Sequence, residues 1–328
     1  GEGALCRIAS LAPSGRSHFG SSSSGLPVTG PRGQPLARMA GYPSFETLRV
    51  TQAAPHVLHV ELARPAKLNT FNRKLWAETR EFFAAVERDG DTRVVVLSGD
   101  GRMFTAGLDL ETAALGVQAT SDAGPAADKG PEPARTALGI RREGKEWQQS
   151  FTNIEQCGKP VIACVHNACI GAGIEMIAAC DIRFCTEDAY YVMAEVNIGM
   201  AADVGGLQRL PKLIGNQSLV RELALSGRKL GAEEALRHGL VSRIFTGKEE
   251  MMSAAVELAK QISGKSPVAT LGIKQFLNYA RDHSVEESLD YSITWNMAML
   301  QGKDLVKAGA SVLMKKTPEF TNLPSSKL

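Results

Sequence analysis

The chain contains 328 residues, enough for one large domain or two smaller ones with an ample hydrophobic core. Its 37 basic and 35 acidic residues leave a formal net charge of +2, which argues against nucleic acid as the main partner. No apolar run in the sequence approaches the roughly 20 residues that a membrane-spanning helix needs.

The first part of the chain has the composition of a targeting segment or a tail. Residues 1–40 are rich in Ser, Gly, Pro and Arg, and Glu2 is the only acidic residue among them. Such a segment cannot bury a core, so we expect it to be disordered. The composition fits a mitochondrial transit peptide, and equally a plain flexible tail or sequence upstream of a start at Met39.

The other end carries a more specific signal. Ser326-Lys327-Leu328 match a peroxisomal address that an import receptor reads. Residues 324–325 are Pro-Ser and should leave this tripeptide accessible. We therefore expect a peroxisomal location, with the mitochondrion as the second candidate.

The core elements follow an alternation of strand and helix patterns. Strands are predicted at residues 57–62, 93–98, 161–165 and 181–185. Asn72 is expected to cap a helix after the first strand, and residues 112–133 have the composition of an exposed insertion.

After residue 210 the patterns become largely helical. Ser266 precedes a proline and Ser284 begins a capping box, so each predicts a helix start. We expect an α/β core over 45–245, a helical region over 246–316 that supports oligomer contacts, and a tail over 317–328.

The six cysteines show neither paired CxxC clusters nor His-rich spacing, which argues against a zinc site. We interpret them as buried free thiols in a reducing compartment. They are Cys6, Cys157, Cys164, Cys169, Cys180 and Cys185.

Two glycine-containing turns are candidates for binding an oxyanion. One comprises residues 103–110 (MFTAGLDL) and the other residues 170–175 (IGAGIE). Each follows a predicted strand, where free N–H groups at a helix start favour negative charge. If both turns converge on one carbonyl oxygen, they form an oxyanion hole for an enolate. Neither has the spacing of a phosphate-binding loop.

Three acidic residues lie in the mostly apolar stretch from Cys169 to Pro211. They are Glu175, Glu195 and Asp203. Apolar surroundings raise carboxyl pKa values, which suits these groups to proton transfer near neutral pH. For Asp203 the alternative is a helix N-cap, and Glu175 would alternatively only shape the pocket or bind its neighbours.

Taken together, these motifs resemble the crotonase (enoyl-CoA hydratase/isomerase) superfamily from about residue 45 to about residue 300. The matching elements, in order, are Arg64-Pro65 with Asn69, then FTAGLDL, KPVIACVH, GAGIE, CDIRF, and QRLPKLIGN with GLVSRIF. The run AADVG at 201–205 is similar to the dienoyl-CoA isomerase branch, because hydratases generally have Gly where Asp203 stands.

The resemblance implies a spiral of β-β-α turns with a helical oligomerisation region, assembled as a homo-hexamer (a dimer of trimers). The implied substrate is an acyl-CoA thioester, with no metal or redox cofactor. The Leu108 and Ala172 amides correspond to the oxyanion-hole donors, and Ala106, Gly107, Leu108, Asp109 and Leu110 to the loop lining the acyl-CoA site.

For the chemistry, the resemblance implies proton removal from C2 of a 3,5-dienoyl-CoA by Glu195. Asp203 then delivers a proton to C6 to give the 2,4-diene, a step in the β-oxidation of unsaturated fatty acids. Glu175 corresponds to the third site carboxylate, where the isomerase branch typically has Asp and hydratases have Glu. Alternatives are therefore a 2-enoyl-CoA hydratase using Glu175 and Glu195, or a non-catalytic protein of this fold that binds acyl-CoA or RNA.

Overall fold

The computed structural model describes residues 42–111 and 133–326, all within one compact unit that extends from Arg38 to Leu328. The segment 1–40 and all but the last residue of the expected insertion lie outside the described residues, as do Cys6 and the last two residues. Among the helices of the described ranges, none combines the length and the apolar character needed to cross a membrane.

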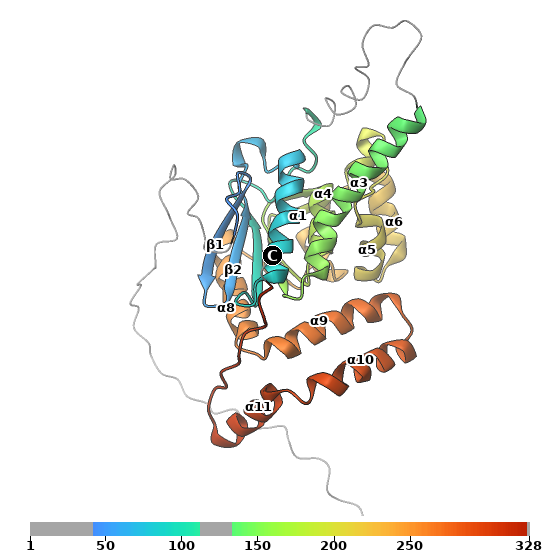
Figure 1. Cartoon of the computed structure of the whole chain (residues 1–328). Helices are drawn as coiled ribbons and strands as arrows, with labels where there is room; N and C mark the ends of the chain where they lie inside the picture. Colours follow the sequence, from blue (N-terminus) through green and yellow to red (C-terminus); the bar gives the residue numbers. More distant parts are fainter. Residues whose placement is uncertain (1–41, 112–132, 327–328) are drawn as a thin grey trace, which may run out of the picture. The chain divides into compact units, whose positions relative to one another are not determined.

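A mixed sheet of six strands forms the centre of the fold (Figure 1). Its strands, in spatial order, are β1 (Leu48–Ala54), β2 (Val57–Leu62), β3 (Val94–Gly99), β4 (Val161–Val165), β6 (Ile182–Thr186) and β9 (Arg243–Phe245). β1 runs antiparallel to β2, and the remaining neighbours are parallel. The predicted strands are confirmed, with β3 and β6 each shifted by one residue.

A smaller sheet lies beside the first and was not anticipated from the sequence. It consists of β5 (Ala168–Ile170), β7 (Tyr190–Val192) and β8 (Leu230–Gly231). β5 follows β4 and β7 follows β6, so successive strand pairs contribute one strand to each sheet. This arrangement is the β-β-α spiral that the resemblance implied.

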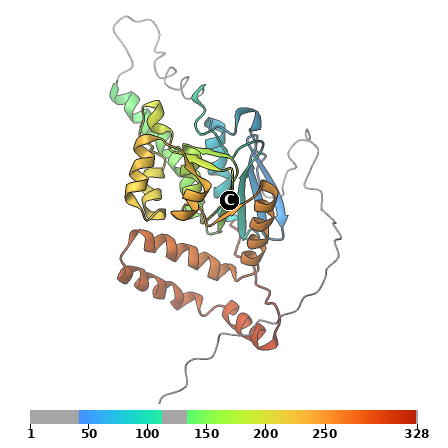
Figure 2. The same cartoon turned by 180° about the vertical axis from the view of Figure 1, so that it is seen from behind.

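Helices cover both faces of the large sheet, as the figures show from opposite sides (Figures 1 and 2). The helices, in chain order, are α1 (Arg73–Arg88), α3 (Pro133–Gln156), α4 (Ala172–Ala178), α5 (Gly206–Leu213), α6 (Gln217–Ser226), α7 (Ala232–Arg237), α8 (Lys248–Ser263), α9 (Pro267–Asp282), α10 (Val285–Met299) and α11 (Lys303–Met314). Two short 3₁₀ helices, η1 (Pro65–Lys67) and η2 (Glu195–Ile198), complete the described elements.

Alternation along β3 explains how one sheet supports two cores. Val94 and Val96 pack in a cluster with Met251 of α8, whereas Val95 and Leu97 pack in the cluster that includes α1, α3 and α4. Successive side chains of a strand point to opposite faces, and a strand covered on both faces reads as a continuous apolar run. The run that predicted a buried strand is therefore confirmed, since β3 is buried throughout.

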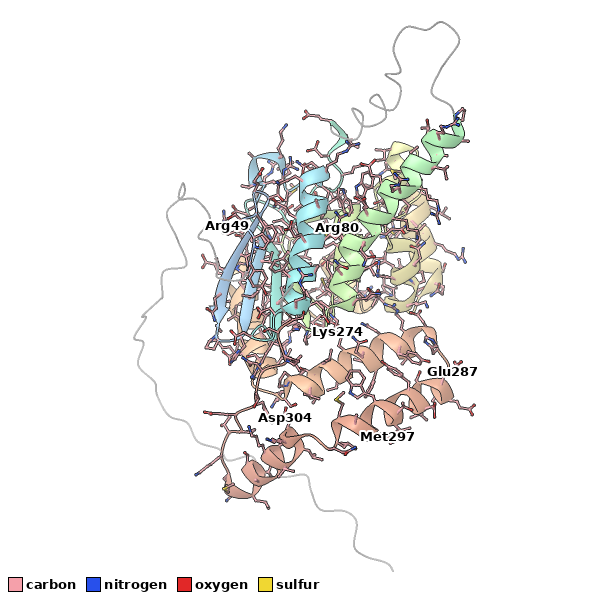
Figure 3. The ribbon with its side chains drawn as sticks, viewed as in Figure 1. Arg49, Arg80, Lys274, Glu287, Met297 and Asp304 are labelled. Atoms are coloured by element: carbon pink, nitrogen blue, oxygen red, sulfur yellow. The ribbon has the colours of Figure 1, made fainter. Side chains whose placement is uncertain are left out.

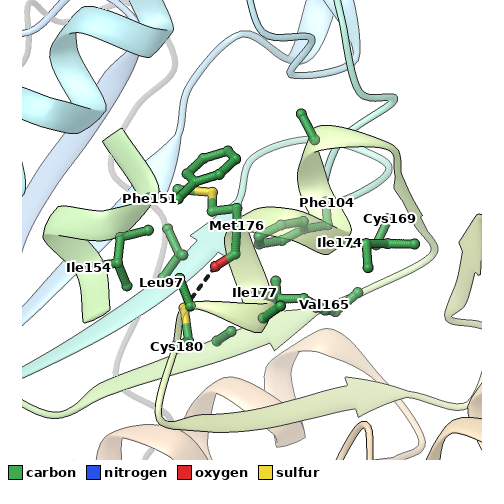
Figure 4. Close-up of a cluster of buried hydrophobic side chains, with 14 of the residues drawn as sticks. Leu97, Phe104, Phe151, Ile154, Val165, Cys169, Ile174, Met176, Ile177 and Cys180 are labelled. Atoms are coloured by element: carbon green, nitrogen blue, oxygen red, sulfur yellow. Dashed lines mark hydrogen bonds between the residues drawn. The ribbon is translucent and has the colours of Figure 1, made fainter. Parts of the chain in front are cut away.

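The larger core holds α4, the short helix that carries one of the site carboxylates. Met176 and Ile177 of α4 lie among Phe151 and Ile154 of α3 (Figure 4). Cys180, which follows α4, donates through Sγ to the Met176 carbonyl oxygen at 3.6 Å. The five described cysteines are buried free thiols, as expected, and burial raises their pKa values.

The predicted helix starts are confirmed by their capping contacts. Asn72 accepts from the Leu75 N–H, Ser266 from the Ala269 N–H, and Ser284 forms the predicted capping box with Glu287. These signals are local, so the sequence alone was sufficient to find them.

The end of the chain returns to the loop between α1 and β3. The Arg93 guanidinium donates to the Phe320 carbonyl at 2.7 Å, and the Gly90 N–H donates to Ser325 Oγ at 3.0 Å. The Ser326 N–H donates to the Arg88 carbonyl at 3.2 Å. Ser325 and Ser326 are exposed but are held by the folded unit, whereas residues 324–325 were expected only to leave the end accessible.

Candidate active site

The first predicted turn lies directly against the strand that leads into the second. Beyond β3, Thr105 forms a parallel bridge with Cys169 of β5. The Thr105 N–H donates to the Ala168 carbonyl at 3.1 Å, and the Ile170 N–H donates to the Thr105 carbonyl at 3.1 Å. These backbone bonds set the two turns side by side, although 65 residues separate Thr105 from Ile170 in the chain.

The closest approach of the two turns depends on glycine. Gly107 has φ +89°, and a Cβ there would lie 2.9 Å from the Ile170 carbonyl oxygen. Gly171 has φ +51°, and a Cβ there would lie 4.0 Å from the Gly107 Cα. Both positions need a left-handed backbone and the absence of a side chain, which only glycine combines without strain.

Two amide groups at this junction remain available to a ligand. Ala172 is the first residue of α4, so its N–H has no partner within the helix. The Leu108 N–H likewise donates to none of the backbone acceptors in residues 42–111 and 133–326. The flanking amides are used, because Gly107 N–H donates to Thr105 Oγ1 and Asp109 N–H to the Phe71 carbonyl.

Glu195 lies against the second turn. It begins η2, three residues beyond β7, and the Gly171 N–H donates to the Val192 carbonyl of β7 at 2.8 Å. A Cβ on Gly171 would meet the Glu195 Oε1 at 3.0 Å, so the carboxylate reaches the glycine itself. Burial, together with the negative charge of Asp203, raises the pKa of Glu195.

Glu175 is the most deeply buried of the three site carboxylates. It projects from α4 with 3% of its surface exposed, and its Oε1 accepts from the Gly206 N–H at 2.9 Å and the Val204 N–H at 3.3 Å. Burial raises the pKa of Glu175 to about 7, and repulsion from Glu195 and Asp203 adds to that effect.

Asp203 lies in the loop between η2 and α5 and is the most exposed of the three. Partial burial raises its pKa above the usual range. The alternative reading of Asp203 as a helix N-cap is wrong, because α5 begins at Gly206 with Gly205 as its N-cap and no side-chain cap. The buried Glu175 carboxylate, from a distant part of the chain, instead accepts from the first amide of α5.

The remaining loop residues surround this junction. Asp109 is buried and pairs with Arg64 at 3.1 Å, so its carboxylate holds the loop to the segment before α1. Ala106 donates its N–H to the Leu68 carbonyl, while the side chain of Leu110 is exposed. The Leu110 side chain can therefore contact a ligand at the surface.

Asn69 and Asn167 both adopt a left-handed backbone conformation. Asn69 is fully buried, with φ +55°, and its Nδ2 donates to three carbonyls of the loop before Thr105, at Asp100, Met103 and Phe104. Asn167 has φ +50°, a left-handed backbone conformation that asparagine adopts more readily than most residues.

One contact to the site could not be read from the sequence. Gln148 of α3 donates from Nε2 to the Asp203 carbonyl at 2.7 Å across 55 residues of chain. Gln148 lies outside every recognised motif, and only the packing of α3 brings it to the loop. As for metals, no group of three or more His, Cys, Asp or Glu side chains within the described ranges is placed to hold one.

This fold defines the class of the protein, together with three interacting carboxylates and two amides that have no backbone acceptor within residues 42–111 and 133–326. The family model described as enoyl-CoA hydratase/isomerase matches residues 52–129 and 140–322, and the chain belongs to that family. A solved enoyl-CoA hydratase from Bacillus anthracis is similar to it, with a TM-score of 0.73, 26% identity, and coverage of 84% of this chain and 99% of that one.

Curated relatives narrow the comparison to one branch. The chain is 51% identical to the mitochondrial Delta(3,5)-Delta(2,4)-dienoyl-CoA isomerase of Homo sapiens, over 87% of this chain and 84% of the relative. It is 51% identical to the enzyme of that name from Mus musculus, over 83% and 81%. It is 39% identical to the peroxisomal enzyme from Arabidopsis thaliana, over 87% and 99%.

Proposed function

We propose that the protein is an isomerase that converts 3,5-dienoyl-CoA to 2,4-dienoyl-CoA in the β-oxidation of unsaturated fatty acids. The observation that supports this most directly is the joint presence of Glu195 and Asp203 beside two free amides. Relatives at about 50% identity that carry the isomerase name support the same reaction. CoA enters as part of the substrate, and proton transfer along the diene needs no additional electron carrier.

The first step is removal of a proton from C2. A proton next to a thioester is weakly acidic, so its removal needs both a base and stabilisation of the resulting dienolate. Ionised Glu195 takes this proton, and the negative charge moves to the thioester oxygen. The N–H groups of Leu108 and Ala172 receive that oxygen, because their turns meet at Gly107 and neither amide donates to another backbone acceptor in the described part of the chain.

The second step returns a proton at the other end of the conjugated system. Protonated Asp203 delivers it to C6, which gives the conjugated 2,4-diene. One carboxyl must therefore be charged while its partner is neutral. Burial raises the pKa values of both Glu195 and Asp203, and repulsion from Asp203 further raises that of Glu195. Such coupled groups share a proton more readily than isolated ones do.

In the proposed isomerase reaction, Glu175 shapes the site and does not position a water. A hydratase would use Glu175 and Glu195 together on water, and the Glu at position 175 is the residue that favours that alternative. The Glu175 Oε1, however, accepts two amides of the loop that carries Asp203. A non-catalytic role is disfavoured by the full set of three carboxylates.

The decisive experiment compares two substrates with the purified protein. Ultraviolet absorbance would follow formation of the conjugated diene from 3,5-dienoyl-CoA, beside hydration of 2-enoyl-CoA under the same conditions. We expect rapid diene formation. Fast hydration without any conjugated diene would refute the isomerase and establish the hydratase.

A substitution assigns the second proton transfer. Asp203→Asn should abolish isomerisation while the protein still folds and binds CoA thioesters, since Asn cannot donate a carboxyl proton. Thermal unfolding and titration with a non-reacting acyl-CoA serve as controls. Full activity in Asp203→Asn would remove Asp203 from the mechanism.

For assembly we propose a homo-hexamer, formed as a dimer of trimers through the helical region. Large apolar side chains of α10 and α11 are exposed in the single chain, which supports contacts between copies. For location we propose an organelle that oxidises fatty acids. The named relatives include both mitochondrial and peroxisomal enzymes, so both the transit peptide and recognition by the import receptor belong to this proposal.

A further inference from the structure

The peptide group between Asp203 and Val204 is held at both of its polar atoms. Its carbonyl oxygen accepts from Gln148 Nε2 at 2.7 Å, and its N–H donates to Glu175 Oε1 at 3.3 Å. Gln148 belongs to α3 and Glu175 to α4, so the contacts come from separate helices. Fixing one peptide plane restricts the ψ angle of Asp203, and with it the direction of its side chain.

Within its own loop, the Asp203 carboxylate interacts with the Asp203 backbone N–H. The residue lies outside regular structure, in the stretch between the end of η2 and the start of α5. Gly205, two residues later, has φ +123°, a conformation open mainly to glycine. A catalytic side chain on such a loop depends on neighbouring groups to hold it in a productive position.

The support for Gln148 is itself firm. Trp147, its neighbour, stacks on Trp76 of α1 with ring centroids 5.6 Å apart and an interplanar angle of 13°. Ser150 Oγ donates to the Trp76 carbonyl at 2.9 Å. α3 is thus fixed against α1 on both sides of Gln148. A donor on a packed helix loses less conformational entropy when it binds a loop than a donor on another loop would.

We propose that Gln148 is a positioning residue for Asp203, acting through the Asp203–Val204 peptide group. Gln148 donates to the carbonyl, Glu175 accepts from the N–H, and the pair aims the Asp203 carboxyl at the distal end of the acyl chain. This inference rests on the proposed function, in which Asp203 protonates C6. Gln148 touches the backbone of the loop and contributes no proton of its own.

The chain offers a matched control on the same helix. Gln149 is exposed, and its Nε2 donates to Asn153 Oδ1 at 2.7 Å, away from the site loop. Methionine has a length and a helix propensity similar to those of glutamine but offers no donor. Gln148→Met therefore removes the contact to Asp203, whereas Gln149→Met makes the same chemical change on the neighbouring residue.

The readout should separate the two proton transfers. The wild type, Gln148→Met, Gln149→Met and Asp203→Asn are compared in heavy water with 3,5-dienoyl-CoA. Formation of the 2,4-diene reports the complete reaction, and deuterium in the recovered substrate at C2 reports removal and return of the first proton. KM and thermal unfolding of each variant are measured in parallel.

We expect kcat for isomerisation in Gln148→Met to fall by roughly 10- to 100-fold, the size of effect that misplacing a reacting group produces. KM should change by less than about twofold, and the ratio of C2 exchange to isomerisation should rise toward that of Asp203→Asn. Gln149→Met should match the wild type. A Gln148→Glu variant, which places a carboxylate against the Asp203 carbonyl, should lose at least as much activity.

Two results would overturn this inference and leave the proposed function intact. One is a Gln148→Met variant with the kinetics of Gln149→Met. The other is a parallel loss of C2 exchange and isomerisation, which would show a general structural role. A wild-type protein that does not isomerise the diene would instead overturn the proposed function, and this inference with it.

Discussion

Glu175 combines two properties that oppose each other at neutral pH. Its Oε1 accepts two backbone amides, an arrangement that favours the charged form. Its burial has the opposite and larger effect and raises the pKa from 4.5 to about 7. The folded protein therefore binds a proton at Glu175 more tightly than the unfolded chain does, and this difference links the residue to stability.

Glu175→Gln should consequently be more stable than the wild type at high pH only. As pH rises from 4.5 through about 7, the wild type loses stability. Over this range the unfolded chain releases the Glu175 proton more readily than the folded protein does, which favours unfolding. Gln can still accept from the amides and does not ionise. We expect a gain of about 1–3 kcal/mol at pH 8 and no gain from ionisation at pH 4.

Denaturant unfolding at several pH values measures this difference. A matched substitution at an exposed carboxylate in the middle of α1, Glu81→Gln, should show no such gain at pH 8. A Glu175→Gln variant whose stability follows that of the wild type across the whole range would contradict the assigned cause.

At the scale of structural elements, the proposed reaction depends on the short distance between the two glycine turns. Gly107 approaches the Ile170 carbonyl so closely that an added Cβ would lie 2.9 Å from the oxygen. Any side chain must push the turns apart and move the amides of Leu108 and Ala172 relative to each other. An oxyanion hole depends on two donors that both reach one oxygen, so small displacements of one turn are costly.

Gly107→Ala should therefore reduce kcat by about 100-fold, close to the loss caused by removing one oxyanion donor. The left-handed backbone at φ +89° also predicts a loss of stability of about 1 kcal/mol. Gly144→Ala is the control, because an added Cβ there meets no atom within 4 Å and Gly144 lies within α3. That control should keep full activity and gain about 0.5–1 kcal/mol of stability. Steady-state kinetics with thermal unfolding would show whether the two variants differ in this way.

These elements also show where reading the sequence succeeds and where it fails. The apolar run Val161–Val165 and the cap at Asn72 depend on neighbours in the chain, and both were predicted correctly. The start of α5 was misread because its acceptor is Glu175, about 30 residues earlier, rather than Asp203. Gln148 gave no signal, since its role depends on the packing of α3 against the site loop.

At the scale of the whole molecule, Lys274 joins the helical region to the α/β core. Its side chain is buried at the boundary between α9 and the core (Figure 3). The Nζ atom donates to the carbonyls of Ile154 and Lys159 and to Asp181 Oδ2, each at 2.9 Å. One ammonium group thus satisfies acceptors from three segments, which makes the orientation of α9 dependent on it.

Lys274→Met should cost about 3–5 kcal/mol in the free energy of unfolding, because it removes the buried ammonium that pairs with the Asp181 carboxylate and donates to the two carbonyls. The exposed Lys265, just before α9, is the control, and Lys265→Met should change stability by less than about 0.5 kcal/mol. Chemical unfolding of both variants tests the difference. A Lys274→Met protein as stable as the wild type would show that water or neighbouring groups replace the ammonium.

The helical region also predicts how copies of the chain associate. The exposed apolar side chains of α10 and α11 include Leu289, Ile293, Met297, Leu305, Val306, Val312 and Leu313. A surface of this character on one pair of helices marks a contact between proteins. Figure 3 shows Met297 on α10, on the helical region that lies apart from the sheet. We therefore expect a homo-oligomer whose interface includes this surface.

Ile293→Lys should shift the protein toward smaller species, because it places a charge among the exposed apolar side chains of α10. Analytical ultracentrifugation over a range of concentrations measures the shift, and the wild type should sediment as a hexamer. Thr294→Lys, at a polar exposed position of the same helix, makes the same change in charge and should leave the assembly intact. If Ile293→Lys keeps the mass of the wild type, α10 lies outside the interface and the contacts must involve another surface. A wild type that sediments as a monomer would refute the hexamer itself.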